Sequence, residues 1–408
     1  MRAVKINIDF PAVCFLILAM CVSMELYFTW QLPKSIVNAV CAIVLFLYLP
    51  KIKISKQSII LIFLLFINYA YNYTHNTISF SLISFFNVIS LAVISMFVIL
   101  SSIDFKIKLF RSFEFFMKCI CCVSLAGWLL YLLGFSLPHY YSNTSDYYSH
   151  EVYYMFVVGV NNSILDLLPR FCGMFLEPGH IGSTCCLLLY INRFNFKDKT
   201  NYVYLLPIVL SLSLAAYCLF FIGLCLHCFL KGVHILRYIL FLGAFAGIFT
   251  IIGLTYNAGD NILNEKILSR LVFVDGELSG DNRTSMLFDA YFEDWLKDGD
   301  IINGYGRRAY SEGNGSTNIL HGCASYKRFF FVNGIIGSIL VMALYLSLFY
   351  QYRSRQGWGF FVLYVLCNMI RDYPFRLMWL YIFILGVAVL SLPENVTMER
   401  NERHVLKE

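Results

Sequence analysis

The stretch RFCGMFLEPGH, at residues 170–180, places ionisable side chains directly before a strongly apolar segment. It contributes Arg170, Glu177 and His180. An arginine can hold a phosphate through its planar fork of donors, and a carboxylate or imidazole can accept a proton from a hydroxyl group. Because ionisable side chains at membrane depth usually serve function, the stretch predicts a polar site at the mouth of a membrane segment. The alternative is an interfacial helix cap, with Glu177 at a helix N-terminus and Arg170 extended to the headgroups.

A second candidate lies in the segment LSGDNRTSMLFDAYFEDW. Arg283 is the single cation of this segment and precedes a predicted amphipathic helix. Its guanidinium suits a phosphate or pyrophosphate group. An ion pair with Asp281 or Glu277 is the alternative that the sequence leaves open.

A third group of candidates lies in the glycine-rich segment DIINGYGRRAYSEGNGSTNILHGCASYKRFFFVNGIIG. The glycines predict a loop with close backbone approaches, but the segment lacks the GK[ST] ending of a phosphate-binding P-loop. Arg307 and Arg308 are candidates for binding an anion. His321 is a candidate general base or hydrogen-bond donor.

The composition indicates a membrane protein. Hydrophobic residues make up 59% of the 408 residues and charged residues 14%, against about 25% charged residues in an ordinary soluble domain. The net charge of +6 does not indicate nucleic-acid binding, because the cations lie in short loops between apolar runs. Most of the 14 cysteines lie inside those runs, where Cys behaves as a small hydrophobe; a bridge between Cys172 and Cys323 stays open. No metal-ligand spacing occurs.

The apolar runs predict an all-α polytopic membrane protein with about 12 transmembrane helices. The first run follows two cations but no small-residue cleavage site, so we expect a retained helix rather than a signal peptide. The predicted helices are residues 11–30, 35–50, 58–73, 78–100, 117–135, 172–192, 202–214, 216–231, 236–255, 328–350, 357–370 and 375–392.

The distribution of lysine and arginine predicts the topology. The apolar run 202–231 is either one long helix or a tight hairpin that turns near residues 214–217. With the hairpin, most of the 31 cations fall on one side of the membrane, as the positive-inside rule requires. We therefore expect a hairpin and both termini in the cytoplasm. The short outer loops then keep only four cations, Lys34, Arg170, Arg371 and Arg376.

This topology predicts five regions along the chain. Residues 1–135 form N-terminal transmembrane helices, residues 171–255 central helices, and residues 328–408 C-terminal helices with a cytoplasmic tail. Two outer loops separate them, at residues 136–170 and 256–327. A loop as long as the second is uncommon unless it has a function or is disordered, and its aromatic, helix-like segments favour order.

The chain resembles the bacterial O-antigen polymerase family over residues 165–350. The similar segments are, in chain order, RFCGMFLEPGHIGS, LPIVLSLSLAAYCLFFIGL, DNRTSMLFDAYFEDW, GYG and FFFVNGIIGSIL. The R…EPG element and the pairing of GYG with a later GIIG are the more specific parts. The related O-antigen ligases place a histidine at a fixed distance before the glycine pair. Here Cys323 and Ala324 occupy that position, which favours a polymerase over a ligase.

The resemblance implies an enzyme of surface-polysaccharide synthesis. Such a polymerase joins oligosaccharide repeat units carried on undecaprenyl pyrophosphate, at the periplasmic face of the bacterial inner membrane. It is a glycosyltransferase that needs no metal and no cofactor, with a C-type glycosyltransferase-like fold and a large periplasmic loop. Its expected partners are the lipid-linked oligosaccharides, membrane lipids and a chain-length regulator, and not nucleic acid.

The candidate residues fit that chemistry. A pyrophosphate leaving group needs fixed cations where its charge develops, and an acceptor hydroxyl needs a base. The candidate cations are Arg170, Arg283, Arg307 and Arg308, the candidate catalytic residues are Glu177, His180 and His321, and Tyr305 offers an aromatic face to a sugar. The alternatives are a flippase for lipid-linked oligosaccharides, an O-antigen ligase, and a structural membrane protein. A flippase would show paired halves, and no internal repeat is evident.

Overall fold

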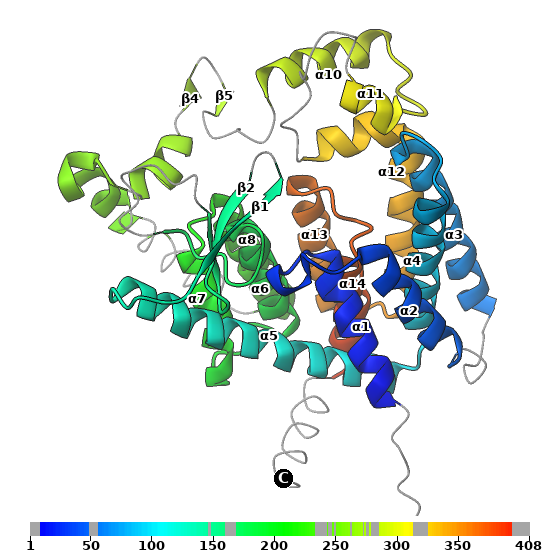
Figure 1. Cartoon of the computed structure of the whole chain (residues 1–408), viewed down its shortest axis with the longest axis horizontal. Coiled ribbons are helices and arrows are strands. Elements are labelled where there is room, and N and C mark those ends of the chain that lie inside the picture. The colour runs from blue at the N-terminus through cyan, green and yellow to red at the C-terminus, as the bar shows by residue number, and fades with distance from the viewer. Residues whose placement is uncertain are drawn as a thin grey trace, which may run out of the picture.

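The computed structural model of the chain is mostly helical (Figure 1). It describes residues 9–48, 56–145, 148–159, 169–232, 243, 247–248, 250–261, 263–271, 273–274, 277–278, 285–312 and 325–393. The helices are α1 (Asp9–Ser23), α2 (Lys34–Phe46), α3 (Lys56–Asn76), α4 (Leu82–Leu100), α5 (Ile103–Leu132), α6 (Pro178–Ile191), α7 (Tyr202–Leu210), α8 (Leu214–Lys231), α10 (Met286–Asp298), α11 (Gly306–Glu312), α12 (Tyr326–Gln351), α13 (Arg355–Ile370) and α14 (Leu377–Leu390).

Two small antiparallel sheets accompany the helices. The first contains β1 (Tyr140–Ser145), β2 (Tyr148–Val152) and β3 (Val157–Gly159), in the order β1-β2-β3. The second pairs β4 (Phe273–Val274) with β5 (Glu277–Leu278). Both sheets lie in the segments that the sequence predicts as outer loops, so the helical bundle itself agrees with an all-α membrane protein.

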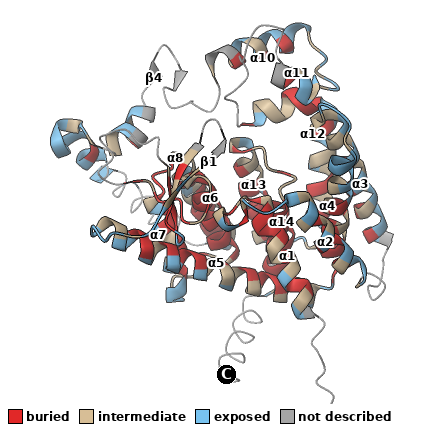
Figure 2. Cartoon of the chain, in the orientation of Figure 1, coloured by how far each residue is buried: buried red, intermediate tan, exposed pale blue. Residues whose placement is uncertain are grey.

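Helix α14 is the centre of the bundle. Every residue from Leu377 to Leu390 is buried, and Figure 2 shows the helix as continuously buried. A helix that is apolar on all sides is stable only when other helices surround it, and α14 contacts α1, α4, α5, α6 and α13. On one side of this centre α6 packs against α7 and α8, and on the other side α3 packs against α4 and α12 (Figure 1).

Four described helices are long and apolar enough to cross a membrane. They are α4, α5, α8 and α12. Helices α6 and α14 contain 14 residues each, so each is about 21 Å long, against a hydrocarbon core of about 30 Å. The structure therefore supports a helical membrane protein, and the number of 12 spans stays a prediction.

The hairpin predicted within 202–231 is present. Helix α7 ends at Leu210 and α8 begins at Leu214, and between them Leu212 has a positive φ of 45°. The side chain of Ser213 caps α8 by accepting from Ala216 N at 3.5 Å. The turn lies about three residues earlier than predicted.

Three predicted helix boundaries were wrong. Helix α1 ends at Ser23 rather than at residue 30, and Glu25 directly after it has a positive φ of 55°. Helix α5 begins at Ile103 rather than near residue 117, because Ser102 caps it and Asp104 occupies its first turn. Helix α6 begins at Pro178 rather than at residue 172, because the preceding stretch is held by other backbone segments: Val157 N donates to Gly173 O and Tyr27 N donates to Met174 O. Most of the helix predicted at 236–255 lies outside the described residues, and residues 250–255 are helical.

The buried Lys106 joins three helix ends at the side of the bundle opposite α10 and α11. Its ammonium donates to Ile99 O at 2.8 Å, Ser101 O at 2.7 Å and the Tyr352 hydroxyl at 2.9 Å. The carbonyls at a helix C-terminus have no partner within the helix. Lys106 therefore caps α4 and attaches it to α5 and to the end of α12.

We expect Lys106→Met to lower the free energy of unfolding by about 2–4 kcal/mol, because it leaves buried carbonyl groups without a donor. The thermal unfolding midpoint of purified protein in detergent measures the effect. The exposed Lys197, in the loop after α6, provides the matched control, since Lys197→Met removes the same charge from the surface. Equal midpoints for the two variants would contradict the capping role.

Candidate functional site

The segment RDYPFR, residues 371–376 between α13 and α14, connects the polar groups at one end of the bundle. This is the end that carries α10 and α11, at the top of Figure 1. The segment is fixed to the core by the Tyr345 hydroxyl of α12, which donates to Pro374 O at 2.5 Å. Its charged and polar side chains reach in several directions, toward α6, α12 and the end of α1.

Arg371 reaches the start of α6. Its Nη2 donates to Glu177 Oε2 at 2.6 Å, and the side chains are 5% and 21% exposed respectively. Burial acts to lower the pKa of Arg371, but the Glu177 carboxylate and Tyr373 together outweigh it and hold this pKa above its ordinary value. Gly179 makes room for the guanidinium, because a Cβ there would lie 2.4 Å from Arg371 Nη2.

His180 contacts the same segment at Tyr373, two residues after Arg371. Its Nε2 lies 3.0 Å from the hydroxyl of Tyr373, and the two rings meet edge to face. Glu177 is the residue that precedes α6, and Pro178 and His180 belong to its first turn. The start of α6 therefore holds Arg371 and Tyr373 together.

The small sheet holds the stretch before α6 from the other side. His150 of β2 is buried, and its Nε2 lies 2.9 Å from Leu176 O. Val157 of β3 donates its backbone N–H to Gly173 O at 2.8 Å. Residues 171–177 are thus clamped between the sheet and the 371–376 segment, which explains why they are not helical.

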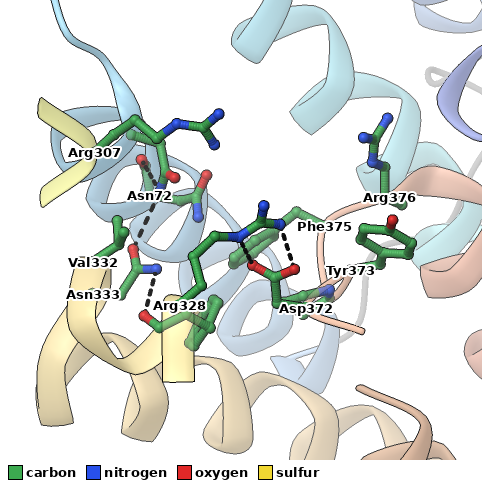
Figure 3. A pocket seen from close by; sticks show the side chains of 12 residues that line it. Asn72, Arg307, Arg328, Val332, Asn333, Asp372, Tyr373, Phe375 and Arg376 are labelled. Carbon is green, nitrogen blue, oxygen red and sulfur yellow. Dashed lines mark hydrogen bonds and ion pairs between the residues drawn. The ribbon is translucent and has the colours of Figure 1, made fainter. Parts of the chain in front are cut away.

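A pocket with a volume of about 210 Å³ opens beside this network (Figure 3). It lies between α3, α11, the first turns of α12 and the 371–376 segment. The lining residues are Asn72, Asn76, Arg307, Arg328, Phe329, Val332, Asn333, Asp372, Tyr373, Pro374, Phe375 and Arg376. Among the described residues, the lining therefore contains three guanidinium groups and one carboxylate.

Arg328 and the carboxylate of Asp372 form a bidentate pair across the pocket. Arg328 Nε donates to Oδ2 at 2.7 Å and Nη2 donates to Oδ1 at 2.5 Å (Figure 3). The Asp372 side chain is 8% exposed and that of Arg328 is 23% exposed. Burial raises the pKa of Asp372, and the guanidinium of Arg328 opposes this effect.

Arg307 brings a second guanidinium to the pocket from α11. It has no carboxylate partner in the described part of the chain, and Figure 3 shows its side chain extending over the pocket. Arg307 and Arg328 lie beside the same ring, at 5.9 Å and 6.0 Å from the centre of Tyr310. Burial and the neighbouring charge of Arg328 lower the pKa of Arg307. An anion placed between the two guanidiniums would relieve this repulsion.

Arg376 supplies the third guanidinium, at the far side of the pocket. It donates to Ser23 O at 2.8 Å and lies 3.4 Å from Glu25 Oε1, at the end of α1. Burial acts to raise the pKa of Glu25, but Arg376 and Lys34 together hold it below its ordinary value. Arg376 is 41% exposed, so its anchoring leaves part of the side chain accessible.

Amides from α3 and α12 form the floor of the pocket. Asn76 Nδ2 donates to Asn333 Oδ1 at 3.3 Å, and Asn333 Nδ2 donates to Phe329 O at 3.1 Å (Figure 3). The hydroxyl of Tyr71 lies 2.9 Å from Asn333 O and 3.0 Å from Asn303 O. These contacts hold α3, α12 and the loop before α11 in one arrangement.

A kink in α12 sets the position of the two cationic elements. Gly334 has φ 62° and ψ −165° inside the helix, so the helical hydrogen bonds are interrupted there. The loop before α11 replaces them, because Ile335 N donates to Ile301 O at 3.0 Å and Ile336 N donates to Ile302 O at 3.1 Å. Gly304, with φ 80°, packs its backbone against that of Gly334.

Aromatic side chains cover this junction. Trp295 and Phe288 of α10, Tyr310 of α11 and Phe331 of α12 form a buried cluster. Tyr305 packs its ring against Phe331 at a centroid distance of 5.5 Å and donates its backbone N–H to Phe331 O. The cluster fixes α11, and with it Arg307, above the first turns of α12.

The structure brings together some of the site residues predicted from sequence. Glu177 and His180 lie in the Arg371 network, and Arg307 lines the pocket. Arg308 is exposed on α11, Tyr305 belongs to the aromatic cluster, and Arg170 binds Ser211 O in the α7–α8 turn at 3.0 Å; these three do not line the pocket. Arg283 and His321 lie outside the described residues, as does Cys323. Cys172 is a buried free thiol.

Sequence reasoning missed Arg328, Arg371, Asp372 and Arg376 as site residues. Two of them carried a signal, because Arg371 and Arg376 are among the few cations of the short outer loops. Nothing in the sequence indicated that their segment faces α12. Within the described ranges, no three His, Cys, Asp or Glu side chains gather as a metal site.

Comparison with known proteins identifies no relative. No protein-family model matches the chain, and neither a curated protein nor a solved structure shows significant similarity to it.

We expect Glu177→Gln to lower the free energy of unfolding by about 3–5 kcal/mol, because Arg371 is left as a buried charge without its counter-ion. The unfolding midpoint in detergent measures this loss. The matched control is Glu25→Gln, which removes a carboxylate from a more exposed group of ion pairs and should cost about 1 kcal/mol or less. The double variant Glu177→Gln/Arg371→Met should recover part of the loss; no recovery would argue against the ion pair as the cause.

We expect Gly334→Ala and Gly304→Ala each to destabilise the protein by roughly 2–5 kcal/mol. A Cβ at either glycine would lie 2.5 Å from backbone atoms of the other segment, at a positive φ. Gly159→Ala is the control, because an added Cβ there meets no atom within 4 Å. Thermal unfolding in detergent distinguishes the two variants from this control. A wild-type midpoint for Gly334→Ala would show that the glycine at the kink is not needed for stability.

Proposed function

We propose that the protein is a glycosyltransferase that polymerises oligosaccharide repeat units carried on undecaprenyl pyrophosphate, at the periplasmic face of a bacterial inner membrane. The product is an O-antigen or another surface polysaccharide. The growing chain is transferred from its lipid pyrophosphate to a hydroxyl group of the next lipid-linked unit. The end of the bundle with α10 and α11 then faces the periplasm, and both termini lie in the cytoplasm.

The observation that carries the proposal is the convergence of Arg307, Arg328 and Arg376 on one pocket. When the glycosyl bond breaks, the electron pair passes to the pyrophosphate, whose negative charge increases. Fixed guanidiniums at that place stabilise the transition state more than the ground state. Three guanidiniums against one carboxylate match a group with the charge of a pyrophosphate.

The surroundings of the pocket suit a lipid-linked substrate. Helices α3 and α12, which border it, carry exposed apolar side chains along their lengths, including Ile59, Ile60 and Phe63 on α3 and Ile335 and Ile339 on α12. Such faces are compatible with acyl or prenyl chains. A prenyl carrier can therefore lie against these helices while its pyrophosphate enters the pocket. The asparagines Asn72, Asn76 and Asn333 provide hydrogen-bonding groups for sugar hydroxyls.

The Arg371 network has a positioning role in this proposal. Glu177 is committed to Arg371, and His180 meets Tyr373. These contacts orient Asp372, Tyr373 and Arg376, the residues that face the pocket from the same segment. Removal of Glu177 would thus reduce activity through the geometry of the pocket.

A deletion strain complemented with variants tests the proposal. We expect Arg307→Ala and Arg328→Ala to abolish the polysaccharide ladder on a gel, or to reduce it at least 100-fold, while a single repeat unit is still attached to lipid core. Loss of an electrostatic stabiliser of a leaving group costs about 10²–10³ in rate. The control is Arg353→Ala, an exposed arginine at the opposite end of the bundle, which should leave the ladder unchanged. Immunoblots confirm equal protein levels.

The same strains distinguish a polymerase from a flippase. A polymerase defect leaves repeat units on the periplasmic leaflet, whereas a flippase defect leaves them on the cytoplasmic leaflet. If the deletion strain still makes a ladder, or accumulates units only on the cytoplasmic side, the polymerase proposal is wrong.

A further inference from the structure

Asp372 is the one carboxylate among the described residues that line the pocket, and it is held by Arg328. Both of its oxygens accept from the guanidinium, at 2.7 Å and 2.5 Å. Its neighbours Arg371 and Tyr373 are committed to Glu177 and His180. The carboxylate therefore has a fixed place in the pocket wall, and its direct contact with Arg328 blocks the donors that an anion would need.

We propose that Asp372 is the proton acceptor of the transfer reaction, and that substrate pyrophosphate releases it by replacing it on Arg328. This inference rests on the proposed function and adds a residue role and an order of events. In the substrate-free protein the ion pair neutralises Arg328 alone, and the pocket keeps a net positive charge from Arg307 and Arg376. The incoming pyrophosphate takes over the donors of Arg328, and the Asp372 carboxylate turns to the acceptor hydroxyl.

Arg328 loses no hydrogen bonds when pyrophosphate replaces Asp372. A guanidinium fork binds a carboxylate or a phosphate with the same two parallel hydrogen bonds. A pyrophosphate carries more charge than a carboxylate, and Arg307 and Arg376 border the same pocket. Arg307 has no carboxylate partner in the described ranges, and its repulsion with Arg328 favours an anion that contacts both. Arg328 therefore gains a partner that the other two arginines stabilise as well.

The exchange also changes the carboxylate. Asp372 is nearly buried, and burial favours the protonated form. Arg328 opposes this while it is paired. Once the guanidinium has moved to the pyrophosphate, the carboxylate loses its main stabilising partner and becomes a stronger base. The base is thus strengthened only when the leaving group is bound.

The bond changes follow directly. The oxygen of the acceptor hydroxyl forms a bond to the anomeric carbon of the donor sugar. The bond from that carbon to the pyrophosphate oxygen breaks, and its electron pair leaves with the pyrophosphate, which the three guanidiniums hold. The hydroxyl proton passes to Asp372 and then to water. No oxidant, reductant or metal takes part in this step.

Two measurements on the purified full-length protein in lipid nanodiscs test the inference. Calorimetry measures binding of inorganic pyrophosphate, and a gel assay measures polymerisation of lipid-linked repeat units. Asp372→Asn should bind pyrophosphate about 10-fold more tightly, because Arg328 no longer has a competing anion. Its polymerisation rate should fall at least 100-fold, since loss of a general base costs about 10²–10⁴. Replacement of a residue with a merely structural role would not strengthen pyrophosphate binding while it slows polymerisation.

Two further variants define the controls. Asp198→Asn removes an exposed carboxylate at the opposite end of the bundle and should leave both measurements unchanged. Asp372→Glu keeps the charge but moves the carboxylate by one methylene group. It should bind pyrophosphate as the wild type does and polymerise 10- to 100-fold more slowly, because displacement by about 1 Å costs about 10² in rate. Asp372→Glu also carries the test if Asp372→Asn does not fold.

The outcomes separate this inference from the proposed function. Wild-type polymerisation by Asp372→Asn or Asp372→Glu overturns the role of Asp372 and leaves the polymerase proposal intact. Pyrophosphate binding that is unchanged or weaker in Asp372→Asn overturns the exchange on Arg328. Absence of polymerisation by the wild-type protein, with tighter pyrophosphate binding by Asp372→Asn, overturns the proposed function and retains only the anion exchange.

Discussion

The ion pair between Arg371 and Glu177 is the contact on which the arrangement of the polar end depends. It joins the residue before α6 to the loop before α14, two elements 194 residues apart in the chain. A buried guanidinium without its counter-ion costs several kcal/mol, so the loop cannot move away from α6 without a large penalty. Because Arg371 is fixed, Asp372, Tyr373 and Arg376 are fixed as well, and these residues form one wall of the pocket.

The opposite wall depends on a backbone contact instead of a charge. At the kink of α12, the loop before α11 supplies the carbonyl groups that the helix lacks, and two glycines allow the backbones to touch. Arg328 lies about one and a half turns before the kink, and Arg307 lies directly after the loop. The backbone contact therefore places both arginines at the pocket. An aromatic cluster seals the junction, so both arginines rest on a rigid base.

The two walls bring together like charges that repel one another when the pocket holds no anion. Asp372 reduces this repulsion for Arg328, while Arg307, which has no carboxylate partner in the described part of the chain, lies over the face of Tyr310. Such a site stores unfavourable electrostatic energy that a phosphate group would release. The proposed chemistry uses this property twice, once to bind the pyrophosphate of the substrate and once to stabilise it as a leaving group.

The sequence by itself determined the helical membrane class, the positions of most helices and the hairpin within 202–231, because hydropathy and charge act locally. It also indicated Glu177, His180 and Arg307 as candidate site residues. Only the tertiary structure decided their partners. Arg328 and Asp372 lie 44 residues apart, and no local pattern relates the first turn of one helix to the loop between two others. The non-helical residues 172–177 and the kink at Gly334 depend likewise on backbone partners distant in the chain.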